Sequence, residues 1–305
     1  DCLARGDTPH GATAYVTLEP CSHHGRTPPC AERLVAEGVA RVAAAMVDPY
    51  HEVAGRGIAM LRAAGIEASA GLMETEARRT HRGFLSRVER GRPWVTLKAA
   101  ATLDGKTALL NGCSKWITGA QARLDVQRLR AENCAILTGS GTVLADDPQL
   151  TVREVPVAAQ PWRVVLDGAL KTDPASRIYQ GGRTLLASCV SDAGRLAAYR
   201  ERGVETLALA GCAGEADLGD LLRQLAARGV NQLMVEAGAG LNGALLRAGL
   251  VDEIVLYLAP SLAGDAARGL FAWPALTDLA DKVRLDIVDF GKVGDDLRLI
   301  LRPAA

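Results

Sequence analysis

Short apolar segments alternate with helix-like segments along the whole chain, and Gly91-Arg92-Pro93 interrupts the alternation once. Strands separated by helices indicate a parallel or mixed sheet covered by helices. A Gly and a Pro this close together are typical of a break between folded units. The sequence therefore predicts an α/β protein with a first domain over 1–91 and a second over 92–305.

In the first domain we expect strands at 14–18, 39–46 and 66–71 and helices at 31–37, 57–64 and 74–90. Gly38 and Gly65 lie where helix C-caps belong. In the second we expect strands at 94–99, 134–138, 162–167, 183–187, 205–210, 232–236 and 253–259. We expect helices at 119–131, 218–228 and 241–248, a loop at 152–161, and an antiparallel pair at 284–289 and 297–301. Four leucines between 218 and 225 follow the period of a half-buried helix.

Charge and composition exclude several classes of protein. Thirty-five basic and 35 acidic residues cancel, which argues against a partner bound by bulk charge, such as nucleic acid or a membrane surface. There is no apolar run long enough to span a bilayer. The seven cysteines are odd in number and lack the spacing of a disulfide framework, so we expect a cytoplasmic protein. Because the chain begins at Asp1 without Met, we also expect that its N-terminus is incomplete.

The most unusual segment contains two cysteines: Glu19-Pro20-Cys21-Ser22-His23-His24-Gly25-Arg26-Thr27-Pro28-Pro29-Cys30. A predicted strand leads into Cys21, and Cys30 opens a predicted helix. Thiols near helix N-termini have lowered pKa values and suit Zn²⁺. The zinc deaminase pattern pairs a His-x-Glu segment with Pro-Cys-x-x-Cys, although here eight residues separate the cysteines instead of two. The alternative is two buried cysteines beside a proline-rich loop.

Two glycine-rich turns follow predicted strands in the second domain. The run from Gly238 to Gly243 has the form G-x-G-x-x-G, which lets backbone N–H groups approach a phosphate. It lies too far along the chain for a Rossmann unit and lacks the acid about 20 residues on. The second turn is Thr138-Gly139-Ser140-Gly141-Thr142. For the first turn, the alternative is that the glycines serve packing. For the second, the alternative is an ordinary loop.

The thiol segment, with GATAYVTLE before it and VAGRGIAMLRAAGI after it, resembles the deaminase half of the bifunctional riboflavin-biosynthesis deaminase/reductase family. The resemblance implies a truncated, cytidine-deaminase-like α/β/α domain with Cys21 and Cys30 as zinc ligands and His23 and Arg26 on the substrate. The family's third ligand and its proton-shuttling Glu lie in a His-Ala-Glu segment, which by alignment would precede Asp1. We therefore expect no deaminase activity from the chain as it stands.

The second domain resembles the family's dihydrofolate-reductase-like half over nearly its whole length. The similarity rests on Lys98-Ala99-Ala100-Ala101-Thr102-Leu103-Asp104-Gly105, Ser114-Lys115-Trp116-Ile117-Thr118-Gly119, the segment 138–148, and Val235-Glu236-Ala237-Gly238. The resemblance implies NADPH contacts by Ala100, Trp116, Thr142, Asp146, Gly168, Gly238, Ala239, Gly240, Leu241, Asn242, Gly243 and Ala244. It implies substrate contacts by Ser114, Arg130, Leu150, Arg153 and Glu236, with Lys98 and Glu236 in catalytic roles.

The family's reaction reduces a phosphoribosylamino-uracil to its ribityl product with NADPH, and its other half deaminates a related pyrimidine. Arg130 and Arg153 suit the substrate's phosphate. Lys98 lies among apolar neighbours, where a cation needs a partner. At 168 the chain has Gly where the family commonly has Ser, and at 50 it has Tyr where the family usually has Asn. The alternative is a non-catalytic remnant or an interaction module that keeps the fold. The apolar C-terminal strands would suit a homo-oligomer.

Overall fold

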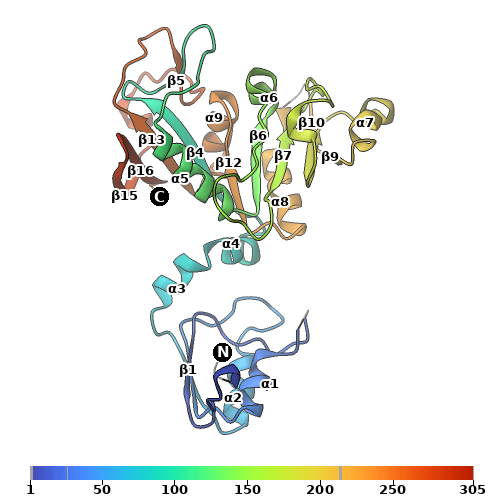
Figure 1. Ribbon diagram of the computed structural model, residues 1–305, viewed down its shortest axis with the longest axis vertical. Helices are drawn as coiled ribbons and strands as arrows, with labels where there is room; N and C mark the ends of the chain where they lie inside the picture. The colour runs from blue at the N-terminus through green and yellow to red at the C-terminus, as the bar shows by residue number, and fades with distance from the viewer. Residues whose placement is uncertain (1–2, 26, 213–214, 305) are drawn as a thin grey trace. The chain divides into compact units, whose positions relative to one another are not determined.

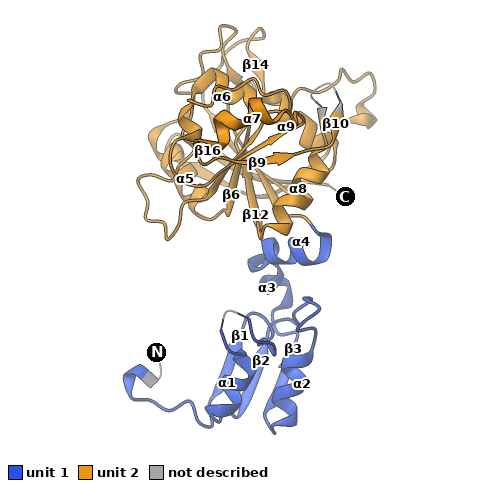
Figure 2. Cartoon of the chain, turned by 90° about the vertical axis from the view of Figure 1, so that its right-hand side faces the viewer, with its two compact units in different colours: residues 1–91 blue, residues 92–305 orange. Residues whose placement is uncertain are grey.

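The computed structural model describes residues 3–25, 27–212 and 215–304, and it divides into two compact units, Asp1–Gly91 and Arg92–Ala305 (Figure 2). Each unit has its own sheet and its own core. The predicted α/β class is confirmed. Among the described residues, none of the helices combines the length and the apolar character that crossing a bilayer requires.

Unit 1 is built on a three-stranded parallel sheet in the order β1 (Thr13–Val16), β2 (Arg41–Ala44) and β3 (Glu67–Ala70), preceded by the 3₁₀ turn η1 (Leu3–Arg5). Helices α1 (Cys30–Ala36) and α2 (Arg56–Ala63) bury Ala31, Ile58 and Leu61 against the sheet. Gly38 and Gly65 follow these helices with φ of +66° and +80°, as expected of C-cap glycines.

The single helix predicted over 74–90 is wrong. The structure has α3 (Glu74–Thr80) and α4 (Arg82–Arg90), and His81 between them leaves the helical conformation with ψ at 12°. The His81 ring makes a 2.9 Å hydrogen bond to the Thr17 hydroxyl. This is a tertiary contact, so a local pattern without Pro or Gly at the break could not reveal it.

Unit 2 is built on a nine-stranded sheet in the order β15-β16-β13-β4-β12-β6-β7-β8-β9. Its bounds are β4 (Trp94–Thr102), β6 (Ala135–Gly139), β7 (Trp162–Leu166), β8 (Thr184–Ser188), β9 (Glu205–Ala208), β12 (Gln232–Val235), β13 (Glu253–Ala259), β15 (Leu285–Val293) and β16 (Asp296–Pro303). The strands from β13 to β9 run parallel, while β16 and β15 add an antiparallel hairpin, as predicted for the C-terminal tail.

Helices cover both faces of this sheet, which gives three layers (Figure 1). One face carries α5 (Ala120–Ala131), α6 (Ser140–Asp146) and α7 (Ala193–Arg200). The other carries α8 (Leu218–Ala227) and α9 (Ala239–Arg247). The predicted leucine stripe of α8 is confirmed, since Leu221, Leu222 and Leu225 are at most 1% exposed. Burying each of them stabilises the unit by about 1.5–3 kcal/mol.

Several elements were not predicted from the sequence. They are α6, α7, β5 (Lys106–Ala108), β14 (Arg268–Gly269), the pair β10 (Gly211–Cys212) and β11 (Glu215–Ala216), and the 3₁₀ turns η2 (Arg177–Tyr179) and η3 (Leu279–Asp281). The turn expected at 138–142 is the end of β6 and the first turn of α6. Because α6 follows β6 and α9 follows β12, both helices begin at the carboxyl edge of the parallel strands, where ligands bind in open α/β sheets (Figure 1).

Candidate active site

A buried ion pair lies at the carboxyl edge of unit 2. Glu236 directly follows β12, and Arg130 occupies the last turn of α5. The Arg130 guanidinium donates from Nε to Oε1 of Glu236 at 2.5 Å and from Nη2 to Oε2 at 3.0 Å. Its Nη1 donates to the Thr151 carbonyl at 3.0 Å. The two side chains are only 10% and 11% exposed, so the pair holds the Glu236 carboxylate in one orientation.

Lys98 lies beside this pair, because β4 is the neighbour of β12 and Leu97 is paired with Val235. Burial lowers the pKa of Lys98, and Arg130 lowers it further, while Glu236 partly opposes them. Burial would raise the pKa of Glu236, but the Arg130 guanidinium and the Lys98 ammonium outweigh it and lower that pKa. The cluster therefore combines a fixed carboxylate with an amine whose proton is more acidic than usual.

The predicted loop at 152–161 is confirmed; two amide contacts close it on itself and a third holds it against α5. Gln160 makes two hydrogen bonds to the main chain of Val152, at 2.8 and 2.9 Å, and Gln127 accepts from the Arg153 amide at 2.9 Å. The Arg153 side chain is exposed and is near enough to Glu236 to lower its pKa. Leu150 is 5% exposed and packs in the core, so its main chain is the part available to a ligand.

The glycine turn after β12 divides into an open and a packed part. A Cβ at Gly238 or Gly240 would have no neighbour within 4 Å, so a phosphate can approach the main chain there. A Cβ at Gly243 would collide with the Ala272 carbonyl, so this glycine is required for packing. Asn242 is 2% exposed and donates to the Ala237 carbonyl at 3.2 Å. The remaining members of the predicted cofactor segment, Ala239, Leu241 and Ala244, are partly buried in α9.

The other predicted cofactor residues lie at the ends of neighbouring strands or on the connection that precedes α5. Thr142 and Asp146 are in α6, Gly168 follows β7, and Ala100 is on β4. Lys115 ties the connection to α6 through Asp146, with Nζ 3.6 Å from Oδ1.

On that connection Ser114 is partly buried, whereas Trp116 is 70% exposed. One face of the Trp116 ring is covered by the Arg123 guanidinium, 4.6 Å from its centre. The connection is thus tied to α6 and to α5 at two adjacent residues, and Trp116 keeps one open aromatic face.

Two buried oxygens at the ends of β6 and β7 have no hydrogen-bond partner among the described residues. They are Thr138 Oγ1 and Asp167 Oδ1, in residues that are 0% and 1% exposed. The other Asp167 oxygen accepts from the Thr172 amide at 2.7 Å. Together with the open glycine turn, this polar edge fits a dinucleotide whose phosphates lie on α9.

The thiols of unit 1 lie together. The Cys30 amide donates to Cys21 Sγ at 3.3 Å, and both residues line a cavity of about 470 Å³. The expected lowering of the pKa is wrong for Cys30, because burial and the neighbouring Cys21 raise it. The described residues contain no cluster of three or more possible metal ligands. Two sulfurs are only part of a zinc site, so no chemical step through zinc is derived from this chain.

Glu19 is a residue that the sequence did not single out, although it fixes the thiol segment. It is 3% exposed and accepts three main-chain N–H groups, from Asp48, Gly55 and Ile58, at 2.9–3.1 Å. Of the residues expected to contact a deaminase substrate, His23 is partly buried with Nε2 3.7 Å from Glu52, and Arg26 lies outside the described residues.

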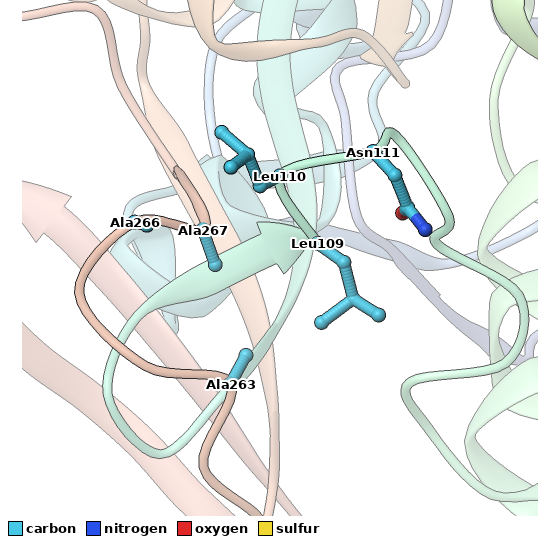
Figure 3. A pocket seen from close by; sticks show the side chains of 6 residues that line it. All are labelled: Leu109, Leu110, Asn111, Ala263, Ala266 and Ala267. Atoms are coloured by element: carbon cyan, nitrogen blue, oxygen red, sulfur yellow. The ribbon is translucent and has the colours of Figure 1, made fainter.

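A cavity of about 510 Å³ lies apart from these clusters, between the segment after β5 and the segment after β13 (Figure 3). It is lined by Leu109, Leu110, Asn111, Ala263, Ala266 and Ala267. The lining carries no titratable side chain and none of the predicted site residues. The titratable side chains described above thus lie in the cluster around Glu236 and not in this cavity.

A buried acid–base cluster beside an open glycine turn, at the carboxyl edge of parallel strands, is typical of a dinucleotide-dependent oxidoreductase. The sequence matches the RibD C-terminal domain family over residues 93–299. It is 48% identical to the riboflavin biosynthesis protein RibD of Escherichia coli over 97% of this chain and 83% of that protein.

Two solved structures are similar to the whole chain. RibD of Acinetobacter baumannii is 39% identical, with a TM-score of 0.89 over 97% of this chain and 82% of that one. A deaminase/reductase from Thermotoga maritima is 30% identical, with a TM-score of 0.84 over 99% and 82%. The chain belongs to the RibD family of bifunctional riboflavin-biosynthesis enzymes.

Proposed function

We propose that unit 2 uses NADPH to reduce the ribose of 5-amino-6-(5-phosphoribosylamino)uracil to the ribityl product. The observation that carries this proposal is the buried cluster of Lys98, Glu236 and Arg130 beside the open turn at Gly238 and Gly240. The Thermotoga maritima relative is described as a reductase of this substrate. Bound NADPH would supply the hydride, and the protein would align donor and acceptor carbons.

The cluster supports distinct roles for its members. Hydride adds to the first carbon of the opened ribose, and the electron pair of its double bond takes up a proton. Lys98 would donate that proton, because its lowered pKa makes it a better acid. Glu236 would accept hydrogen bonds from the sugar or the uracil, while Arg130 orients its carboxylate. The exposed Arg153 would bind the phosphate, since most Arg130 donors are already engaged within the protein.

The test is NADPH oxidation with the ribosylamino substrate. We expect Glu236→Gln and Lys98→Met to lower kcat/KM by about 10²-fold or more. Arg128→Ala, on the exposed face of α5, is the control and should retain the wild-type rate. Wild-type rates in both variants would contradict the assignment. Absence of NADPH binding to the wild type would favour a non-catalytic remnant instead.

For unit 1 we propose that this 305-residue polypeptide does not deaminate the pyrimidine precursor. The printed sequence contains no His-x-Glu segment, and the described residues bring only two sulfurs together. Ammonia release by the purified chain, with bound zinc measured on the same sample, tests this. Release of ammonia at a rate proportional to bound zinc would refute the proposal.

We also propose that two copies associate through β15, an edge strand of the large sheet. Ile287, Val288 and Phe290 on this strand are 49–69% exposed, which is unusual for large apolar side chains in a row. A dimer in sedimentation that Phe290→Lys converts to a monomer would support this. A wild-type monomer at micromolar concentration would count against it.

A further inference from the structure

The order of strands sets the direction in which a dinucleotide lies across unit 2. Lys98 and Glu236 are at β4 and β12, and hydride transfer requires the nicotinamide to meet the substrate there. The open glycine turn after β12 and the unpartnered oxygens of Thr138 and Asp167 lie on the β6 side of this cluster, so the rest of the cofactor extends over β6, β7 and β8. Strands about 4.8 Å apart place β8 roughly 14 Å from β12. The adenosine half therefore falls near the segments that follow β7 and β8.

One cation is fixed in position at this end of the edge. Arg195, in the first turn of α7, donates from Nη2 to the carbonyls of Ala169 and Leu170 at 3.0 and 3.2 Å. These two residues directly follow Gly168, so the guanidinium is anchored on the segment after β7. Its anchors are neutral carbonyl oxygens, and the side chain is exposed. A positive charge is thus held in place without being neutralised by an anchor.

The acid that caps the same helix is engaged with the main chain. The Asp192 carboxylate is adjacent, but its Oδ1 accepts the main-chain N–H of Arg195 at 2.8 Å and caps α7. Elsewhere along this edge, Lys115 is paired with Asp146. Within the described part of the chain, Arg195 is in no ion pair. An unpaired, oriented guanidinium is suited to bind a phosphate through two parallel hydrogen bonds.

We infer that Arg195 binds the 2′-phosphate of the cofactor and thereby makes unit 2 select NADPH over NADH. This inference rests on the proposed reductase function and adds the residue that determines cofactor choice. An Arg near the adenosine ribose is also how other α/β folds accommodate this phosphate. Gly168 has no side chain to offer there, which leaves the recognition to the neighbouring cation.

The test measures binding of NADPH and NADH by calorimetry, so it does not depend on turnover. We expect Arg195→Ala to raise the Kd for NADPH roughly 10- to 100-fold, the loss of charge-assisted hydrogen bonds, and to change the Kd for NADH less than 2-fold. The same variant should bind 2′,5′-ADP more weakly than wild type and bind ADP with unchanged affinity. Arg200→Ala, at the other end of α7, is the matched control and should match wild type for all four ligands.

The outcomes separate this inference from the proposed function. Equal weakening of NADPH and NADH would mean that Arg195 only supports the segment after β7, and it would overturn the inference. An unchanged NADPH affinity in Arg195→Ala would also overturn the inference. A selective loss of NADPH affinity in Lys171→Ala, and not in Arg195→Ala, would do the same. A wild-type chain that binds neither nucleotide would refute the proposed function itself. Thermal unfolding of each variant verifies that the fold is retained.

Discussion

Replacing Arg130 with Met removes the guanidinium and keeps much of the side-chain volume. Glu236, whose side chain is 11% exposed beside Arg130, then loses the two hydrogen bonds at 2.5 and 3.0 Å and the adjacent positive charge. Removing one partner of a buried ion pair costs about 3–5 kcal/mol. Solvent screening reduces this little, because both side chains are close to 10% exposed. We expect the free energy of unfolding of unit 2 to fall by about that amount at pH 7.

The loss should depend on pH with a definite sign. In the wild type the pKa of Glu236 lies below its ordinary 4.5, so its contribution to stability is present above that value and is lost as the pH falls through the lowered pKa. Without Arg130, burial acts against the remaining attraction of Lys98 and raises the pKa of Glu236. The variant's carboxylate can then take up a proton on folding. The difference between variant and wild type should therefore shrink as the pH falls from 7 towards 4.

Urea unfolding followed by circular dichroism at pH 7 and pH 5 measures both effects. Arg128→Met on the same helix is the control, since that side chain is 62% exposed and should cost less than 0.5 kcal/mol. The double variant Arg130→Met/Glu236→Gln should lose less than the sum of the single losses. Equal losses in Arg130→Met and the control, or strict additivity in the double variant, would refute the reasoning.

Two further predictions concern the glycine turn and Asp104, which follows β4. Gly243→Ala should lower the unfolding temperature, because the added Cβ would collide with the Ala272 carbonyl. Gly240→Ala should keep the wild-type unfolding temperature and weaken NADPH binding, because its Cβ would lie in the open part of the turn. The reverse pattern in melting and titration experiments would contradict this. The Thr102 hydroxyl, with main-chain amides, lowers the pKa of Asp104 to about 2, so its contribution is lost as the pH falls from 4 to 2. Thermal melts of Asp104→Asn should be less steeply pH-dependent over that range, and parallel curves would exclude the contribution.

Elements with a strong local signal could be predicted from the sequence. The strand at Glu253–Ala259 has the expected bounds, because apolar and β-branched residues mark a buried strand. Helix α6 could not be predicted, since Ser140-Gly141-Thr142 has turn composition and the helix depends on burying Val143, which is 3% exposed. A signal for α7 was present, because Asp192 caps it and Leu196 and Tyr199 follow at helical spacing.

The candidate site was nominated by residue type and family resemblance, but its geometry depends on strand order. Arg130 and Glu236 are 106 positions apart and meet only because α5 packs over the strands next to β12. No local pattern identifies Glu236 as the partner of Arg130 rather than another acid. The Cys30 pKa shows the same limit, because burial, together with a second thiol nearby, raises the pKa that a helix start was expected to lower.

The Gln160 amide that clasps Val152 has an evolutionary consequence. One side chain makes the two bonds that a neighbouring strand would otherwise make, so the seven residues between these positions form a closed lobe anchored at its base. Insertions or substitutions within the lobe would leave the Thr151 carbonyl in place, and with it the hydrogen bond that this carbonyl accepts from Arg130. If Arg153 binds the substrate phosphate as proposed, changes in this lobe would alter the phosphate site without disturbing the cluster of Lys98, Glu236 and Arg130.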